Sequence, residues 1–142
     1  MIYRHPVRIE FNHCDPAGIV FYPRYFEMTN SVAENFFREV AGYSYAEMMK
    51  AFSGVPTARL EADFKKPSRL GEVLEWQVRA GRFGETSLEL FLTAICDGDV
   101  RVSVRKILVF VSGETGAYLP VPWPKIVRDR ISAAINAAAE NK

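Results

Sequence analysis

The segment from Pro23 to Ala41 constrains the fold of this chain more than any other stretch. A stripe of polar side chains runs along it, spaced 4, 3 and 4 residues apart: Glu27, Ser31, Glu34 and Arg38. The remaining face is rich in large apolar side chains, which predicts a helix buried over a wide arc. Proline suits the first turn of a helix and glycine suits the position after its end, so Pro23 and Gly42 mark the expected limits. Such a helix is about 28 Å long.

Segments with strand character lie on both sides of this helix. Apolar and polar residues alternate from Val7 to Asn12 and from Thr57 to Phe64, a pattern typical of half-buried strands. Further strands are expected over residues 73–81, 86–96 and 100–111. The sequence Asp97-Gly98-Asp99 is a hairpin signal between the last two. The apolar run from Ile107 to Phe110 predicts burial on both faces of the sheet.

The order of these elements indicates the fold class. A strand, a long helix and four strands joined by hairpin-like turns predict an α+β fold, with one antiparallel sheet and one helix packed against it. The 142 residues fit a single domain over 1–142. The tail from about residue 124 is expected to be a helical extension, because apolar residues recur there at helical spacing: Val127, Ile131, Ala134, Ile135 and Ala138.

Composition and charge exclude several classes of function. Hydrophobic residues make up 49% of the chain and its net charge is +1, as in an ordinary globular protein. The basic residues are scattered, so we expect no nucleic-acid partner. No run approaches the roughly 20 apolar residues of a membrane helix, and the first residues lack the apolar region of a signal peptide. With only two cysteines, these features predict a cytoplasmic protein.

Several common catalytic motifs are absent from the sequence. There is no G-x-S-x-G elbow of the kind found in serine esterases. There is also no G-x-G-x-x-G fingerprint and no P-loop, and no residues have zinc-ligand spacing. We therefore expect no metal and no nucleotide cofactor.

The loop before the long helix combines two features that suit acyl-transfer chemistry. Asp15 places a carboxylate at the head of the loop, and Gly18 allows a sharp turn because it adopts positive φ at little cost. The following helix begins with backbone N–H groups that have no partner within the helix. These donors and the positive end of the helix dipole suit an oxygen that gains negative charge.

The run from Asn12 to Phe26 resembles the signature of the hotdog-fold acyl-CoA thioesterases, and in particular the 4-hydroxybenzoyl-CoA thioesterase family. That signature pairs an aspartate with Pro-Ala-Gly and an aromatic-Tyr-Pro sequence. The similarity continues through residues 64–72, 81–88 and 115–122. The pattern departs at His13, where many members carry an acidic residue.

The resemblance implies a hotdog fold, in which an antiparallel sheet wraps around a long central helix. It also implies self-association, with two chains pairing their sheets edge to edge and dimers commonly joining as tetramers. Active sites then lie at the dimer interface. The family's catalytic aspartate corresponds to Asp15, its loop glycine to Gly18, and its carbonyl-polarising amide to the backbone N–H of Tyr22.

A thioester needs little from its enzyme beyond a nucleophile and a site for the oxyanion. Its leaving thiol has a pKa of about 8.5, so it departs as a thiolate with little acid help. Asp15 is expected either to attack the carbonyl directly or to take a proton from water, and the sequence does not distinguish the two roles. No cofactor is implied beyond the coenzyme A of the substrate.

Six further residues are candidates for binding the acyl-CoA. Phe21 and Tyr25 are candidates for lining an acyl pocket, although their rings also suit the core. Four basic residues are candidates for holding the phosphates of coenzyme A, although each also suits a plain exposed position: Lys65, Lys66, Arg69 and Arg82.

The predicted function is hydrolysis of an aryl- or short-chain acyl-CoA. One alternative is a thioesterase that acts on acyl groups carried by acyl carrier protein. Another is an acyl-CoA-binding module without turnover, against which the presence of Asp15 argues.

Overall fold

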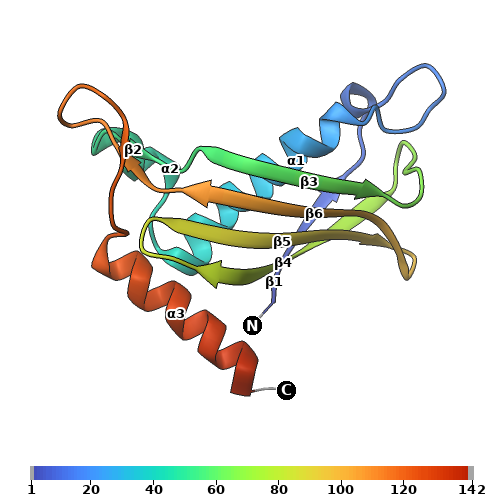
Figure 1. Cartoon of the computed structure of the whole chain (residues 1–142). Helices are drawn as coiled ribbons and strands as arrows, with labels where there is room; N and C mark the ends of the chain where they lie inside the picture. Colours follow the sequence, from blue (N-terminus) through green and yellow to red (C-terminus); the bar gives the residue numbers. More distant parts are fainter. Residues whose placement is uncertain (1, 141–142) are drawn as a thin grey trace.

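The structure is a computed structural model that describes residues 2–140. Its main sheet has five antiparallel strands in the order β1-β4-β5-β6-β3. Their bounds are β1 (Tyr3–Arg8), β3 (Thr57–Phe64), β4 (Val73–Phe83), β5 (Ser87–Cys96) and β6 (Asp99–Val109). The helix α1 (Pro23–Phe36) crosses one face of this sheet (Figure 1). The predicted α+β architecture is therefore confirmed.

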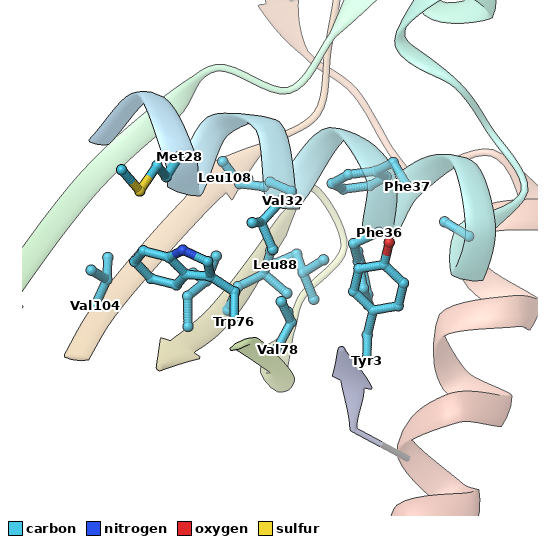
Figure 2. Packing of buried hydrophobic residues seen from close by; sticks show 14 of the residues in the cluster. Tyr3, Met28, Val32, Phe36, Phe37, Trp76, Val78, Leu88, Val104 and Leu108 are labelled. Atoms are coloured by element: carbon cyan, nitrogen blue, oxygen red, sulfur yellow. The ribbon is translucent and has the colours of Figure 1, made fainter. Parts of the chain in front are cut away.

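The central helix forms the core with the inner face of the sheet. It continues past α1 as a short π-helix, η2 (Phe37–Ala41), and ends at Gly42, whose φ is 69°. Val32 points from the helix toward Trp76 and Leu88 of the sheet, and Phe36 lies beside Tyr3 of β1 (Figure 2). The stop at Gly42 and the wide apolar arc were both predicted, and burial against the sheet explains that arc.

The last two strands of the main sheet are joined as the sequence predicted. Cys96 pairs with Asp99, and the two turn residues between them have positive φ, 52° at Asp97 and 76° at Gly98. Two successive positive φ angles match a type I′ turn, whose twist suits antiparallel strands.

The first strand differs from the prediction. β1 ends at Arg8, and after Ile9 the chain forms a 3-10 turn, η1 (Phe11–His13). The side chain of His13 closes this turn, because its Nδ1 accepts the N–H of Glu10 at 2.9 Å. The predicted alternation over 7–12 therefore ends at the fully buried Ile9, and Phe11 is 84% exposed.

The run Ile107–Phe110 also differs from the prediction. Leu108 and Phe110 are buried, but Ile107 and Val109 remain half-buried. The two half-buried residues lie on the outer face of β6, which none of the helices within residues 2–140 covers (Figure 1). The expectation of burial on both faces is therefore wrong for the single chain.

The remaining elements lie around the end of the central helix. A small sheet has the order β2-β7-β8, with bounds Ser53–Gly54, Val111–Ser112 and Leu119–Pro120. α2 (Tyr45–Lys50) is capped by Ser44, whose Oγ accepts the N–H of Glu47 at 3.1 Å. The predicted C-terminal helix is confirmed as α3 (Lys125–Glu140), which packs against η2. No helix within residues 2–140 has the length and apolar character needed to cross a bilayer.

Candidate active site

The loop between β1 and α1 is a tight hairpin with Asp15 at its turn. The N–H of Gly18 donates to the carbonyl of Asp15 at 3.0 Å, and the N–H of Asp15 donates to the carbonyl of Ile19 at 3.0 Å. The carboxylate Oδ1 of Asp15 accepts the N–H of Ala17 at 2.9 Å, an Asx-turn contact. Gly18 has φ of 80°, which explains the need for glycine there.

The loop between β3 and β4 contacts the arm of the hairpin formed by residues 18–20. Val20 pairs with Cys14 within the hairpin and donates its N–H to the carbonyl of Ser68 at 2.9 Å. The N–H of Leu70 donates to the carbonyl of Gly18 at 3.3 Å. Both loops lie at the same end of the sheet, opposite to α3 (Figure 1). The Asp15 turn is therefore held by backbone hydrogen bonds within the hairpin and by further ones to the neighbouring 67–72 loop.

The hairpin leads directly into the start of α1. The carbonyl of Phe21 accepts the N–H of Arg24 at 2.9 Å, and Tyr22 already has helical φ and ψ of −52° and −35°. Among residues 2–140, no acceptor receives the N–H of Tyr22. An unpartnered donor at the positive end of a helix dipole suits a developing oxyanion.

The Asp15 carboxylate retains one unused oxygen. Its side chain is half-buried, and Oδ1 is engaged by Ala17, whereas no donor in the described part of the chain reaches Oδ2. One carboxylate oxygen is thus fixed by the turn, and the other is available for nucleophilic attack or for a proton from water.

Aromatic rings form an open pocket beside the helix start. The pocket has a volume of about 250 Å³, and Tyr22, Tyr25 and Phe64 contribute to its lining. The ring centroid of Phe64 lies 6.0 Å from that of Tyr22 and 5.8 Å from that of Tyr25. Tyr25 is only 4% exposed, so most of its ring belongs to the core. Phe21 is half-exposed and stacks edge-on against Tyr22 at 5.6 Å, outside the pocket lining.

Phe64 also lines the aromatic pocket and was not among the predicted candidates for binding. The sequence placed it at the end of an alternating strand and at the start of the 64–72 run that resembles the family, without a role in binding. Its position just before Lys65 and Lys66, at the end of that strand, was the available signal.

Three of the four predicted basic residues lie near the hairpin. Lys65 and Lys66 line the aromatic pocket, and Arg69 forms a β-bridge with Ile19. Lys66 also forms an exposed ion pair with Asp99 at 3.2 Å. Arg82 lies near the opposite end of β4, about 30 Å beyond Val73, so one chain does not bring it to Asp15.

A partly buried ion pair, which was not predicted from the sequence, lies behind the hairpin. The guanidinium of Arg101 in β6 forms two hydrogen bonds to the carboxylate of Glu72, at 2.9 and 3.0 Å. The Arg101 guanidinium, together with the N–H of Arg69, lowers the pKa of Glu72 to about 2. The residues are 29 positions apart, and no sequence spacing links them.

The same carboxylate belongs to the group that most resembles a metal site. Ligand atoms of Glu72, Cys96 and Asp97 lie within 4.8 Å of one another. Arg101 engages both oxygens of Glu72 and places a positive charge beside them. This arrangement favours an ion pair over a cation site.

A family model and solved structures both relate this chain to thioesterases. A family model, described as the thioesterase-like superfamily, matches residues 9–131 of this chain. A search of curated proteins gave no match. Among solved structures, a gentisyl-coenzyme A thioesterase is 25% identical, with a TM-score of 0.81 over 89% of this chain and 99% of that chain.

Two further structures share the fold at lower identity. A protein from Staphylococcus aureus, solved in complex with CoA, is 15% identical, with a TM-score of 0.87 over 96% of this chain and 85% of that chain. A 1,4-dihydroxy-2-naphthoyl-CoA thioesterase from Synechocystis is 12% identical, with a TM-score of 0.83 over 93% of this chain and 96% of that chain.

Proposed function

Because this chain belongs to the thioesterase-like superfamily, we propose that it hydrolyses an acyl-CoA to the free acid and coenzyme A. One observation carries the proposal. A single ordered segment holds a carboxylate with an unused oxygen, at Asp15, and an unpartnered amide at the start of a helix, at Tyr22.

The proposed reaction uses these two groups on one thioester carbonyl. The carbonyl oxygen accepts the N–H of Tyr22, which stabilises the negative charge that develops there. Asp15 either attacks the carbonyl carbon, giving an anhydride that water then hydrolyses, or takes a proton from an attacking water. In both routes the sulfur leaves as the thiolate of coenzyme A. Gly18 contributes the turn that sets the position of Asp15.

An aryl or short acyl group fits the surroundings of this site. The pocket beside Tyr22 is small and lined by aromatic rings. The gentisyl-coenzyme A thioesterase, which acts on an aromatic acyl group, supports this choice of substrate. We propose that Phe21 and Tyr25 flank the acyl group and that Lys65, Lys66 and Arg69 lie toward the phosphates of coenzyme A.

A second copy of the chain is part of the proposal. β3 is an edge strand, and its apolar side is incompletely covered, with Leu60 and Ala62 half-buried and Phe64 48% exposed. Exposed edges of this kind pair readily with another strand. We propose that two chains pair through β3, that each active site lies beside this junction, and that dimers join further as a homotetramer.

The direct test is the substitution Asp15→Asn. It keeps the size of the side chain and an acceptor for Ala17, so the fold should remain while hydrolysis falls by about 10³-fold or more. The measurement is release of free thiol from a panel of aromatic, short and long acyl-CoAs. Asp129→Asn, on α3 at the other end of the molecule, is the control and should keep wild-type activity. Near wild-type turnover by Asp15→Asn contradicts the assigned role.

The same assay separates the alternative functions. Thiol release from acyl carrier protein thioesters but not from CoA thioesters indicates a carrier-protein thioesterase. Tight binding of acyl-CoA without any thiol release, measured by calorimetry, indicates a binding module.

A further inference from the structure

Arg101 organises the loop that holds the Asp15 hairpin. Its side chain is 9% exposed, and one nitrogen of its guanidinium donates to three oxygens: the carbonyl of Pro67 at 3.1 Å, the hydroxyl of Ser68 at 3.3 Å and Glu72 Oε1 at 2.9 Å. The other nitrogen donates to Glu72 Oε2 at 3.0 Å. One side chain of β6 thus joins the two ends of the 67–72 loop.

The backbone of the loop is fixed by the same two residues. The carbonyl of Arg101 accepts the N–H groups of Lys65 and Lys66, at 2.8 and 3.2 Å. Glu72 Oε1 also accepts the N–H of Arg69 at 2.6 Å. Connecting loops are usually among the more mobile parts of a protein. Here the charge-assisted hydrogen bonds hold the loop in one shape.

The fixed loop is in direct contact with the hairpin that carries Asp15. Ser68 accepts the N–H of Val20, and Leu70 donates to Gly18. The contacts therefore run from Arg101 through Glu72 to the 67–72 loop, and from that loop to Gly18 and Val20 of the hairpin. Arg101 and Glu72 lie at the end of this series of contacts that is farther from Asp15.

We propose that the Arg101–Glu72 ion pair is a positioning device that holds Asp15 in register with the start of α1. The inference rests on the proposed function, because Asp15 is the group being positioned. Neither residue touches the substrate, so both act through the hairpin. A shift of about 1 Å in a reacting group lowers the rate by as much as about 100-fold, and a loosened loop allows such a shift.

The test compares Glu72→Gln with a matched control, Glu89→Gln. Glu89 also accepts from an arginine side chain, Arg105 at 2.6 Å, and from a backbone N–H, that of Arg82 at 3.1 Å. It lies on the outer face of β5 and has no contact with the 67–72 loop. Both substitutions remove one charge and keep an acceptor.

The expected kinetic result differs between the two variants. Glu72→Gln should lower kcat by about 10-fold or more and change KM by less than about 3-fold. Glu89→Gln should keep kcat within about 2-fold. Unchanged kcat in Glu72→Gln, or an equal fall in both variants at equal stability, overturns the proposal.

Hydrogen exchange gives a readout that does not depend on catalysis. The amides of Val20 and Leu70 should exchange about 10-fold faster in Glu72→Gln, while the amides of β5 keep their protection. If the wild type hydrolyses no thioester, the proposed function fails. The exchange experiment still tests whether the Arg101–Glu72 ion pair holds the hairpin. Unchanged exchange at both amides overturns it. Arg101→Lys, which keeps the charge but loses the paired hydrogen bonds, replaces Glu72→Gln should the latter not fold.

Discussion

Tyr22 has two proposed roles that two substitutions can separate. Its ring lines the aromatic pocket, and its backbone N–H is proposed to bind the oxyanion. Tyr22→Ala removes the ring and keeps the amide, whereas Tyr22→Pro removes both. The φ of −52° at this position is compatible with proline.

We expect Tyr22→Pro to lower kcat by about 10²- to 10³-fold, the usual effect of losing one oxyanion donor. Tyr22→Ala should mainly raise KM. Thiol-release kinetics give kcat and KM for both variants, and circular dichroism confirms that each is folded. Equal kcat in the two variants excludes a role for the amide.

Lys106 is a charged residue within the apolar layer of the sheet. It is 3% exposed on β6, between the buried Val104 and Leu108, and the described residues offer its amine no hydrogen bond or ion pair. Burial lowers the pKa of Lys106. The folded state therefore binds this proton more weakly than the unfolded state, so the group favours unfolding while it is charged.

We expect Lys106→Met to stabilise the protein at pH 7, on the order of 1 kcal/mol. The advantage should shrink as pH rises from the lowered pKa toward about 10.4, because the wild-type amine is then neutral when folded. Urea unfolding at several pH values measures this. Lys50→Met, at an exposed position of α2, should change stability by no more than about 0.5 kcal/mol. A loss of stability in Lys106→Met shows that the amine has a partner in the assembled protein.

At the scale of elements, periodicity predicted most of the fold. The polar stripe and Gly42 gave the central helix, and alternation gave the strands from Thr57 onward. The expected hotdog-like arrangement of sheet and helix is confirmed by likeness to the thioesterase structures.

The departures have local physical causes. Phe11 continued the alternation in sequence, but the side chains of Glu10 and His13 close a turn there. The pair of Arg101 and Glu72 was beyond prediction, because only the register of β6 brings these distant residues together. The sequence motif was enough to single out Asp15 as a candidate, but it gave no indication of the Arg101–Glu72 pair behind the hairpin.

Trp123, two residues before α3, anchors the start of this helix in the core, where Val127 and Ile131 of α3 are also fully buried. The ring of Trp123 stacks on Phe37 at 5.9 Å and on Phe110 at 5.1 Å, and its Nε1–H donates to the carbonyl of Ser87 at 3.2 Å. Trp123→Ala should lower the free energy of unfolding by about 3 kcal/mol or more. Urea denaturation measures the loss, and the exposed Ile126→Ala should change little. Because α3 lies at the far end from the hairpin, the folded variant should keep its kcat.

At the scale of the whole molecule, the proposed pairing of two chains through β3 predicts where Arg82 of one chain lies relative to Asp15 of the other. Antiparallel pairing of two β3 edges by a two-fold axis reverses the second sheet. The Arg82 end of one chain then lies on the same side as the Asp15 end of the other.

Mixing two defective variants tests this arrangement. We expect Asp15→Asn to be inactive and Arg82→Ala to bind acyl-CoA weakly. Subunit exchange between them should restore activity to about a quarter of the wild-type level, because mixed dimers contain one site with both residues intact. No recovery indicates that each site uses one chain alone. Wild-type KM in Arg82→Ala identifies Arg82 as an ordinary surface charge.

The placement of Arg101 in β6 has a consequence for protein synthesis. The ribosome makes the aspartate hairpin near the beginning of the chain, but the arginine that anchors its supporting loop emerges 29 residues after Glu72. A nascent or truncated chain that lacks β6 therefore carries the reactive carboxylate without its anchor. If the proposed function and the proposed role of the Arg101–Glu72 pair hold, a chain that stops before β6 should cleave a thioester far more slowly than the full chain.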